Sequence, residues 1–381
     1  MANRGKKSRE KDMTDFANIK SRFTIGDTTL SLPLIQGGMG VGISLSGLAG
    51  SVAGSGGVGV ISTAQIGFDQ DGWETSPLET NLKAIGMHIQ RAREIAAQKQ
   101  KDEKYRGRTG MIAANIMVAT RFYEKYVRAA VAAGVDMIIS GAGLPASLPE
   151  FVRGSKTKIA PIISSLKAAK VILRLWDKKY KRIPDLVVIE GPLAGGHLGF
   201  SPESLEHIDM DAYDKEILDI IETAGEYGKK YGKNIPVAVA GGIDSAKKVR
   251  HYLELGADAV QVATRFVTTW ECDASMAYKQ AYIHAFKEDI RIVKSPVGMP
   301  GRAIYNDFMA RVERGERLPI HCHGCLEKCQ PSKIPYCITD ALVNAARGDV
   351  SNALLFCGAN AWKAERIQTV DEVIEDLFTF E

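Results

Sequence analysis

Residues 237–266 read VAVAGGIDSAKKVRHYLELGADAVQVATRF, and this stretch contains the repeating unit of the fold. It begins with a short apolar run at 237–240, passes through a glycine pair into an amphipathic segment over 246–255, and ends in a second apolar run at 259–262. Gly256 follows the amphipathic segment, as expected where a helix ends in a left-handed residue. The pattern therefore predicts a strand, a helix and a second strand parallel to the first.

Apolar runs of this kind recur along the chain. They lie at 32–35, 58–61, 111–114, 137–139, 160–163, 186–189, 237–240 and 259–262. The runs are almost continuously apolar, which is typical of strands buried on both faces of a parallel sheet. Helical segments separate them, for example at 78–101 and 122–133. Eight strand–helix units predict an α/β fold of the TIM (β/α)8 barrel type, whose ligands bind at the C-terminal ends of the strands. An open doubly wound sheet is the alternative.

The chain has 381 residues, more than the roughly 250 of a minimal barrel. We expect a flexible basic tail at 1–25, the barrel at 26–270, and a C-terminal cap region with closing helices at 271–381. Hydrophobic residues make up 45% and charged residues 25%, a balance that excludes a disordered or disulfide-scaffold protein.

The net charge of +4 equals the excess of basic side chains in residues 1–22. A basic tail on a neutral body is more typical of a solvated terminus than of a nucleic-acid-binding arm. No apolar run approaches the ~18 residues that cross a bilayer, and there is no secretory apolar segment. We therefore expect a cytoplasmic protein with a small-molecule substrate and neither a nucleic-acid nor a membrane partner; a homodimer is one option for its assembly.

Glycine-rich or polar sequences follow the predicted strands. Gly37 and Gly38, with Met39, follow the first strand, and adjacent glycines let a flat ring lie against bare backbone. Asn115 ends the third strand and offers an amide to a heteroaromatic edge, while Glu190 ends the sixth.

The turns after the seventh and eighth strands predict a phosphate site. Gly241 and Gly242 follow the seventh strand, and Ala263 and Thr264 follow the eighth. TIM barrels commonly bind phosphate at these two turns through backbone N–H groups at helix N-termini. Tight turns alone would also explain the glycines.

His197 is the one histidine of seven at a predicted strand end. It follows Gly195 and Gly196, which favours acid–base chemistry at the mouth of the barrel over a structural hydrogen bond that holds the loop. We expect a second group of histidines at the surface: His88, His207, His251 and His284.

Four motifs resemble the nitronate monooxygenase (2-nitropropane dioxygenase) family. They are QGGMG at 36–40, AGGHLG at 194–199, AGGI at 240–243 and ATRF at 263–266. FMN-dependent enoyl-ACP reductases belong to the same superfamily. The resemblance covers roughly residues 30–300, and the histidine loop is its most specific motif.

The resemblance implies FMN, with His197 facing the substrate as a base or hydrogen-bond donor. The residues implied to hold the cofactor are Gly37, Gly38, Met39, Asn115, Glu190, Gly195, Gly196, Gly241, Gly242, Ala263 and Thr264. The chain departs from the family pattern at three positions. Leu193 stands where a glutamate is frequent, Ala263 replaces a glycine, and Glu190 matches the reductases where many monooxygenases have glutamine.

Two functions are compatible with this resemblance. The first is an FMN-dependent oxidoreductase that oxidises alkyl nitronates or uses NAD(P)H to reduce a small substrate. The alternative is an NAD(P)H-dependent enoyl-ACP or enoyl-thioester reductase. A barrel like IMP dehydrogenase would need a catalytic cysteine near the sixth strand, and no cysteine precedes Cys272. A metal–thiolate binding module on an inactive barrel is opposed by the intact His197 loop.

Four of the six cysteines have the spacing C-x2-C-x3-C-x7-C: Cys322, Cys325, Cys329 and Cys337. Such close spacing in a cytosolic chain favours a metal site over disulfides. The spacing resembles the [4Fe–4S] loop of flavin-containing enoate reductases; zinc and free thiols are the alternatives. His321 and His323 could replace thiolates as zinc ligands, but their adjacency to Cys322 makes this sterically awkward.

Overall fold

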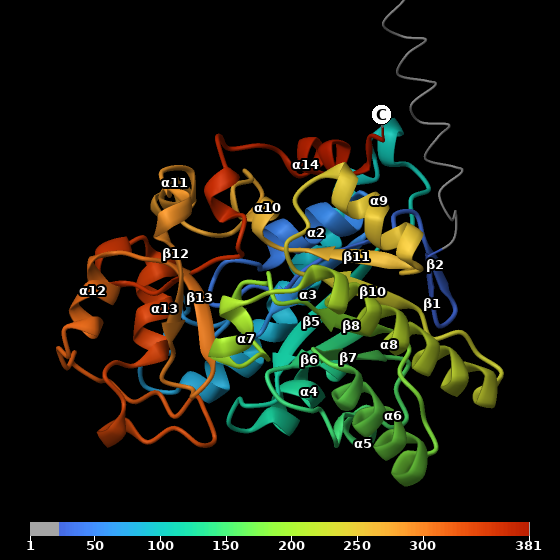
Figure 1. Ribbon diagram of the computed structural model, residues 1–381, viewed down its shortest axis with the longest axis horizontal. Coiled ribbons are helices and arrows are strands. Elements are labelled where there is room, and N and C mark those ends of the chain that lie inside the picture. Colours follow the sequence, from blue (N-terminus) through green and yellow to red (C-terminus); the bar gives the residue numbers. More distant parts are fainter. Residues whose placement is uncertain (1–22, 381) are drawn as a thin grey trace, which may run out of the picture.

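The computed structural model describes residues 23–380, and its centre is a closed barrel of eight parallel strands (Figure 1). The barrel strands are β3 (Leu34–Gln36), β4 (Val58–Ser62), β5 (Met111–Met117), β6 (Met137–Gly141), β7 (Lys158–Ile163), β8 (Val187–Glu190), β10 (Val237–Ala240) and β11 (Ala259–Val262). The strand β11 closes the ring by pairing with β3 on one side and β10 on the other. Each predicted apolar run forms a strand, so the TIM barrel is confirmed and the open sheet is excluded.

Helices follow the strands and cover the outside of the barrel (Figure 1). They are α2 (Ser46–Gly54), α3 (Pro77–Lys99), α4 (Tyr123–Ala132), α5 (Leu148–Phe151), α6 (Leu166–Tyr180), α7 (Pro202–Glu206), α8 (Met210–Tyr231), α9 (Ala246–Leu255) and α10 (Thr264–Val267). Helix α9 ends at Gly256, which has φ +115°, and Gly134 follows α4 with φ +72°. Both glycines adopt the left-handed conformation that the sequence predicts.

The N-terminal end of the barrel is closed by an antiparallel hairpin, β1 (Phe23–Ile25) and β2 (Thr28–Leu30). Its apolar side chains Phe23, Ile25 and Leu30 belong to the same buried cluster as the side chains inside the barrel. The hairpin thereby seals this end, and the ligand-binding end is the opposite one, where the strands reach their C-termini.

The C-terminal region adds a second, antiparallel sheet beside the barrel, drawn in orange and red in Figure 1. Its elements are α11 (Met276–Ile283), β12 (Ile290–Lys294), β13 (Pro300–Ile304), α12 (Asp307–Glu313), α13 (Ile338–Arg347) and β14 (Leu355–Phe356). Strand β13 pairs with β12, with β14 and with β9 (Gly196–His197), which belongs to the histidine loop. The added sheet is therefore hydrogen-bonded directly to the candidate site.

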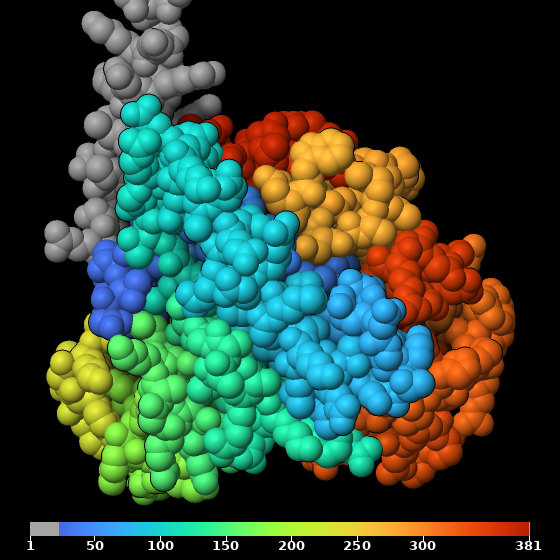
Figure 2. All heavy atoms as spheres, turned by 180° about the vertical axis from the view of Figure 1, so that it is seen from behind, coloured from blue at the N-terminus to red at the C-terminus, as the bar shows by residue number. Residues whose placement is uncertain are grey.

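The C-terminal region also contacts the segment before α3. In the view from behind, the orange and red surface adjoins the light-blue segment (Figure 2), and Arg347 donates a hydrogen bond to the carbonyl of Phe68 at 3.0 Å. The last helix, α14 (Val370–Phe378), returns to the barrel and packs on α9 and α2. Five short 3-10 helices complete the described elements: η1 (Glu103–Tyr105), η2 (Lys287–Asp289), η3 (Pro331–Lys333), η4 (Val350–Asn352) and η5 (Ala361–Lys363).

The expected division into three parts stays a prediction. Of the basic tail predicted at 1–25, only 23–25 fall within the described residues, and these form β1. Helices of the described chain are all too short or too polar to span a bilayer.

Candidate active site

A cavity of about 470 Å³ lies at the C-terminal ends of the barrel strands. This cavity is lined by every residue that the sequence predicted to hold the cofactor, and by His197. The residues are Gly37, Gly38, Met39, Asn115, Glu190, Gly195, Gly196, His197, Gly241, Gly242, Ala263 and Thr264. They come from five different strands that the barrel topology gathers at one end. Asn115 lies within β5 rather than at its end, because β5 continues to Met117.

The glycines of this cavity have distinct roles. A Cβ on Gly195 would lie 2.5 Å from the carbonyl carbon of Cys357, and a Cβ on Gly242 would lie 2.8 Å from the side-chain Cβ of Leu193. These two glycines let the loop after β8 pack between the β10 turn and the C-terminal region. Gly196 is different, because it has φ +73° and no atom within 4 Å of its absent Cβ. Its bare backbone borders open space, as a site for a flat ring requires.

Buried polar groups fix the glycine loop after β3. The side-chain oxygen of Gln36 accepts a hydrogen bond from the backbone N–H of Val60 at 3.0 Å, and its amide nitrogen donates to the carbonyl of Gly37. The hydroxyl of Ser44 accepts from the backbone N–H of Met39 at 2.8 Å. The loop is therefore held in place before any ligand binds. The sequence shows Gln36 as the first residue of the QGGMG motif but predicted no role for it, and it did not point to Ser44.

His197 is held at the edge of the cavity by the C-terminal region. It pairs with Gly301 of β13, and its Nε2 lies 2.8 Å from the hydroxyl of Ser295. Its ring contacts Phe356 edge to face, with 4.8 Å between the ring centroids. Burial lowers the pKa of His197 to about 4. The imidazole is therefore neutral at neutral pH and can both accept and donate a hydrogen bond.

Glu190 lines the same cavity at the end of β8. Its carboxyl group has no hydrogen-bond partner among the described residues. Burial raises the pKa of Glu190 to about 7, because the charged form loses its hydration. Near neutral pH this group can therefore exist in either protonation state.

The C-terminal region supplies a wall that the sequence did not predict. The backbone N–H of Gly358 donates to the hydroxyl of Thr264 at 3.2 Å, and the Asn360 amide donates to the carbonyl of Gly242 at 3.1 Å. These contacts tie both predicted phosphate turns to the segment after β14. Cys272 and Cys357 are buried, and Cys357 also lines the cavity. The residues joined by these two hydrogen bonds are 94 and 118 positions apart along the chain, so no local sequence pattern indicates that they meet.

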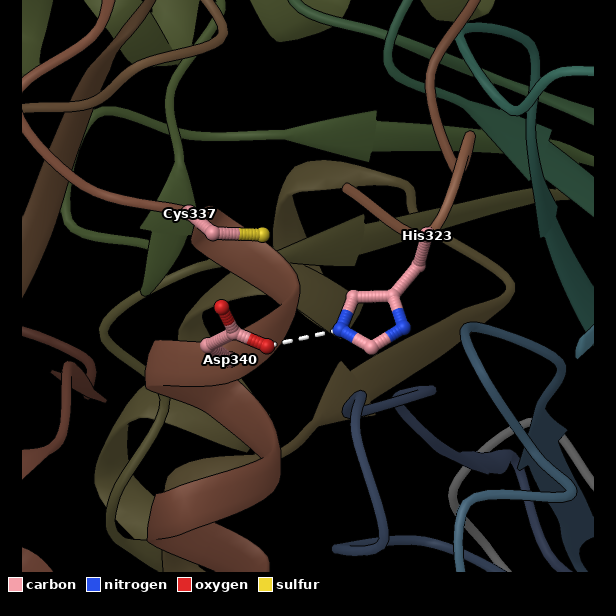
Figure 3. A group of neighbouring side chains, drawn as sticks. All are labelled: His323, Cys337 and Asp340. Atoms are coloured by element: carbon pink, nitrogen blue, oxygen red, sulfur yellow. Dashed lines mark hydrogen bonds and ion pairs between the residues drawn. The ribbon is translucent and has the colours of Figure 1, made fainter. Parts of the chain in front are cut away.

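The predicted four-cysteine ligand set of Cys322, Cys325, Cys329 and Cys337 stays a prediction. Cys325 lines the main cavity, whereas Cys337 lines a second cavity of about 520 Å³. Within residues 23–380, the His, Cys, Asp and Glu side chains whose ligand atoms all lie within 4.8 Å of one another are His323, Cys337 and Asp340 (Figure 3). Neither a four-thiolate zinc site nor a [4Fe–4S] cluster finds support here.

One histidine prediction is wrong and another stays a prediction. The Nε2 of His323 lies 2.7 Å from a carboxylate oxygen of Asp340, and this contact does not test the expected steric difficulty of His323 as a zinc ligand. His88, which was expected at the surface, is buried on α3, and its Nδ1 lies 3.2 Å from the hydroxyl of Ser46. The sequence around His88 is polar and therefore suggested an exposed position, but His88 lies on the face of α3 that packs against α2.

Comparison with known proteins places these features in a family. The family model described as nitronate monooxygenase matches residues 22–379. A probable nitronate monooxygenase of Staphylococcus saprophyticus is 29% identical over 170 residues, or 44% of this chain and 41% of that relative. A second, from Staphylococcus aureus strain Newman, is 31% identical over 162 residues, or 41% of this chain and 43% of the relative. The chain thus spans less than half of the length of these curated relatives.

Solved structures share the fold over most of their length. FabK from Thermotoga maritima has a TM-score of 0.65 and 22% identity, with 96% of this chain and 94% of FabK covered. The nitroalkane oxidase from Streptomyces ansochromogenes has a TM-score of 0.65 and 19% identity, with 91% and 95% covered. At these identities the likeness is one of fold.

Proposed function

The chain belongs to the nitronate monooxygenase family, and from this premise we propose that it is an FMN-dependent oxidoreductase acting on a small molecule. The observation that supports the proposal most is the convergence on one cavity of glycine backbones, an asparagine amide and a neutral histidine. A cytoplasmic location and a homodimer stay predictions.

The residues of the cavity fit FMN in our proposal. Backbone N–H groups at Gly241, Gly242, Ala263 and Thr264 would bind its phosphate. The backbones at Gly37, Gly38, Met39, Gly195 and Gly196 would border its ring, with the Asn115 amide at the ring edge. When bound, FMN supplies the electron-transfer chemistry, while the protein positions it and excludes competing reactions.

His197 is the proposed catalytic residue. Its neutral imidazole can donate a hydrogen bond to an oxygen of the substrate or accept a proton from its reacting carbon. Ser295 would orient the imidazole through its hydroxyl, and Phe356 would restrict rotation of the ring. Glu190, with a pKa of about 7, can hold or release a proton inside the same cavity.

We favour an alkyl nitronate as the substrate because the family model matches nearly the whole chain. The second candidate is an NAD(P)H-dependent enoyl-thioester reductase. It is favoured by Glu190, because the reductases have a glutamate at this position where many monooxygenases have glutamine.

Anaerobic stopped-flow absorbance separates the two candidates. The holoenzyme is mixed with propyl-2-nitronate, NADH or NADPH, and the loss of oxidised-flavin absorbance is followed. Rapid loss with the nitronate alone supports nitronate oxidation. Rapid loss with a nicotinamide cofactor alone would overturn it in favour of the reductase. Purified protein without flavin absorbance, even after incubation with FMN, would overturn both.

A further inference from the structure

A second cavity, outside the proposed active site, contains a compact group of metal-binding side chains. It has a volume of about 520 Å³ and lies between α12, α13 and the segment before α3. The sulfur of Cys337, a ring nitrogen of His323 and a carboxylate oxygen of Asp340 all lie within 4.8 Å of one another. Donor atoms of three residue types thus lie close enough together to bind one metal ion.

Local structure places all three donors. Cys337 is the residue before α13, and Asp340 lies in the first turn of that helix. His323 comes from the preceding loop and faces both residues across a short gap (Figure 3). The His323 side chain is 7% exposed, and its ring stacks on Trp73 with 4.6 Å between centroids. The stacking fixes the plane of the imidazole and leaves its Nε2 directed at Asp340, 2.7 Å away.

A second imidazole approaches the same carboxylate. Nδ1 of His321 lies 3.8 Å from Oδ2 of Asp340, and the backbone N–H of His321 donates to this oxygen at 3.2 Å. The His321 side chain is largely exposed, so its ring can rotate without disturbing packed neighbours. The site thereby has a fourth donor atom, a second imidazole nitrogen, within reach.

We propose that this group binds one divalent transition-metal ion of the zinc type through His323, Cys337 and Asp340, with His321 as the fourth ligand. Thiolate and imidazole donors favour zinc over magnesium or calcium, which prefer oxygen ligands. Binding replaces the hydrogen bond between His323 and Asp340 with metal–ligand bonds and releases the thiol proton of Cys337 to solvent.

The ion would fasten a segment that has little regular structure of its own. Residues 314–337 connect α12 to α13 and contain only the short helix η3. The same segment reaches the active-site cavity, which Cys325 and Leu326 line. The backbone N–H of Arg121 donates to the carbonyl of Cys325 at 2.9 Å, next to a bridge between Thr120 and Leu326. The metal would therefore hold one wall of the active site in place from outside it.

The test measures metal content and does not depend on activity. The full chain is produced in zinc-supplemented medium and assayed by elemental analysis, and the metal-free protein is titrated with Co(II), whose thiolate complexes absorb in the near ultraviolet. We expect about one zinc per chain and a Co(II)–thiolate band. His323→Gln and Cys337→Ser should each weaken Co(II) binding at least tenfold, since even changes outside the ligand shell cost about 10–100-fold.

Cys322→Ser and Cys329→Ser are the matched controls, because they change cysteines of the same loop outside the group and should retain the metal. Equal metal loss in these controls would overturn the proposal, as would full retention in His323→Gln. Stoichiometric iron and sulfide would overturn it in favour of the four-cysteine prediction, and protein that binds neither zinc nor Co(II) would also overturn it. If Cys337→Ser fails to fold, thermal melts of the parent protein with and without Zn(II) replace it. Zn(II) should raise the Tm by a few degrees, and an unchanged Tm contradicts the site.

Discussion

At the scale of single residues, burial shifts the pKa values of two titratable groups of the cavity in opposite directions, each toward the neutral form. The pKa of Glu190 rises to about 7 and that of His197 falls to about 4. In both cases burial removes water from around the charged form, and neighbouring groups do not stabilise the charge enough to compensate. At pH 7 the cavity is therefore lined by a neutral imidazole and by a carboxyl group that is close to half protonated.

Glu190→Gln should remove a proton equilibrium near pH 7. We expect the flavin absorbance of the holoenzyme, or its rate of reduction, to change with an apparent pKa near 7, and this change to vanish in the variant. Glu254→Gln is the matched control, because Glu254 is an exposed glutamate on α9. A transition that persists unchanged in Glu190→Gln would assign it to another group.

His197→Asn should lower kcat by about 10²–10⁴-fold if the imidazole transfers a proton, while flavin content stays the same. Ser295→Ala should give a smaller loss, about tenfold, because the imidazole remains but loses its 2.8 Å hydroxyl partner. Steady-state kinetics of purified holoenzymes measure both effects. Ser295→Thr keeps the hydroxyl and should recover most of the activity; a threonine variant as poor as the alanine variant would argue against this orienting role.

At the scale of elements, close packing depends on small residues. Helix α2 consists largely of small side chains and is buried along nearly its whole length. It lies so close to β4 that a Cβ on Gly59 would come 1.8 Å from the carbonyl oxygen of Ala49. The glycine in β4 therefore determines how near the helix can pack, and hence where the loop between β3 and α2 lies.

Gly59→Ala should destabilise the protein by about 3 kcal/mol or more, because the helix must move to admit the methyl group. Urea unfolding followed by circular dichroism measures the change. Gly225→Ala is the matched control: Gly225 lies inside α8 with no atom within 4 Å of its absent Cβ. There alanine should stabilise by about 0.5–1 kcal/mol. Equal stability of the two variants would refute the packing argument.

At the scale of the whole molecule, the end of the chain is tied back to the barrel. Asp371 of α14 accepts hydrogen bonds from three residues of the α2–η1 region: Lys99 at 2.7 Å, Tyr105 at 2.6 Å and Ser55 at 3.2 Å. Burial raises the pKa of Asp371, but the hydrogen bonds from Lys99 and Tyr105 outweigh it and hold this pKa below the usual value. The ionised carboxylate is thus the form that the folded protein stabilises.

Asp371→Asn should cost about 1–3 kcal/mol of folding stability at pH 7, since it weakens charge-assisted hydrogen bonds. Because the folded-state pKa is lowered, the contribution of Asp371 is present above the unfolded pKa and is lost as the pH falls through the folded value. The stability difference between the two proteins should therefore begin to shrink as the pH falls below about 4, the ordinary value for Asp, and disappear below the folded-state pKa. Urea titrations at several pH values measure this, and a constant difference down to pH 3 would contradict it.

Local sequence patterns were sufficient to predict the barrel and the strand-end residues that line its cavity, but not the wall that the C-terminal region adds. Apolar runs buried on both faces specify parallel strands, and closure of the barrel brings Gly38, Glu190 and Gly242 to one end whatever the details of packing. The sequence did not predict helix α2, because its small residues are buried on all sides and show no amphipathic period.

Only the tertiary structure decided which distant segments complete each site. The partner of His197, Ser295, comes from the C-terminal region through a strand pairing that no local period encodes. The cysteine spacing predicted a metal site, but the start of α13 and the stacking of His323 on Trp73 decided that Cys337 faces His323 and Asp340. Spacing along a loop limits how far apart side chains can be, whereas their directions depend on packing against the rest of the fold.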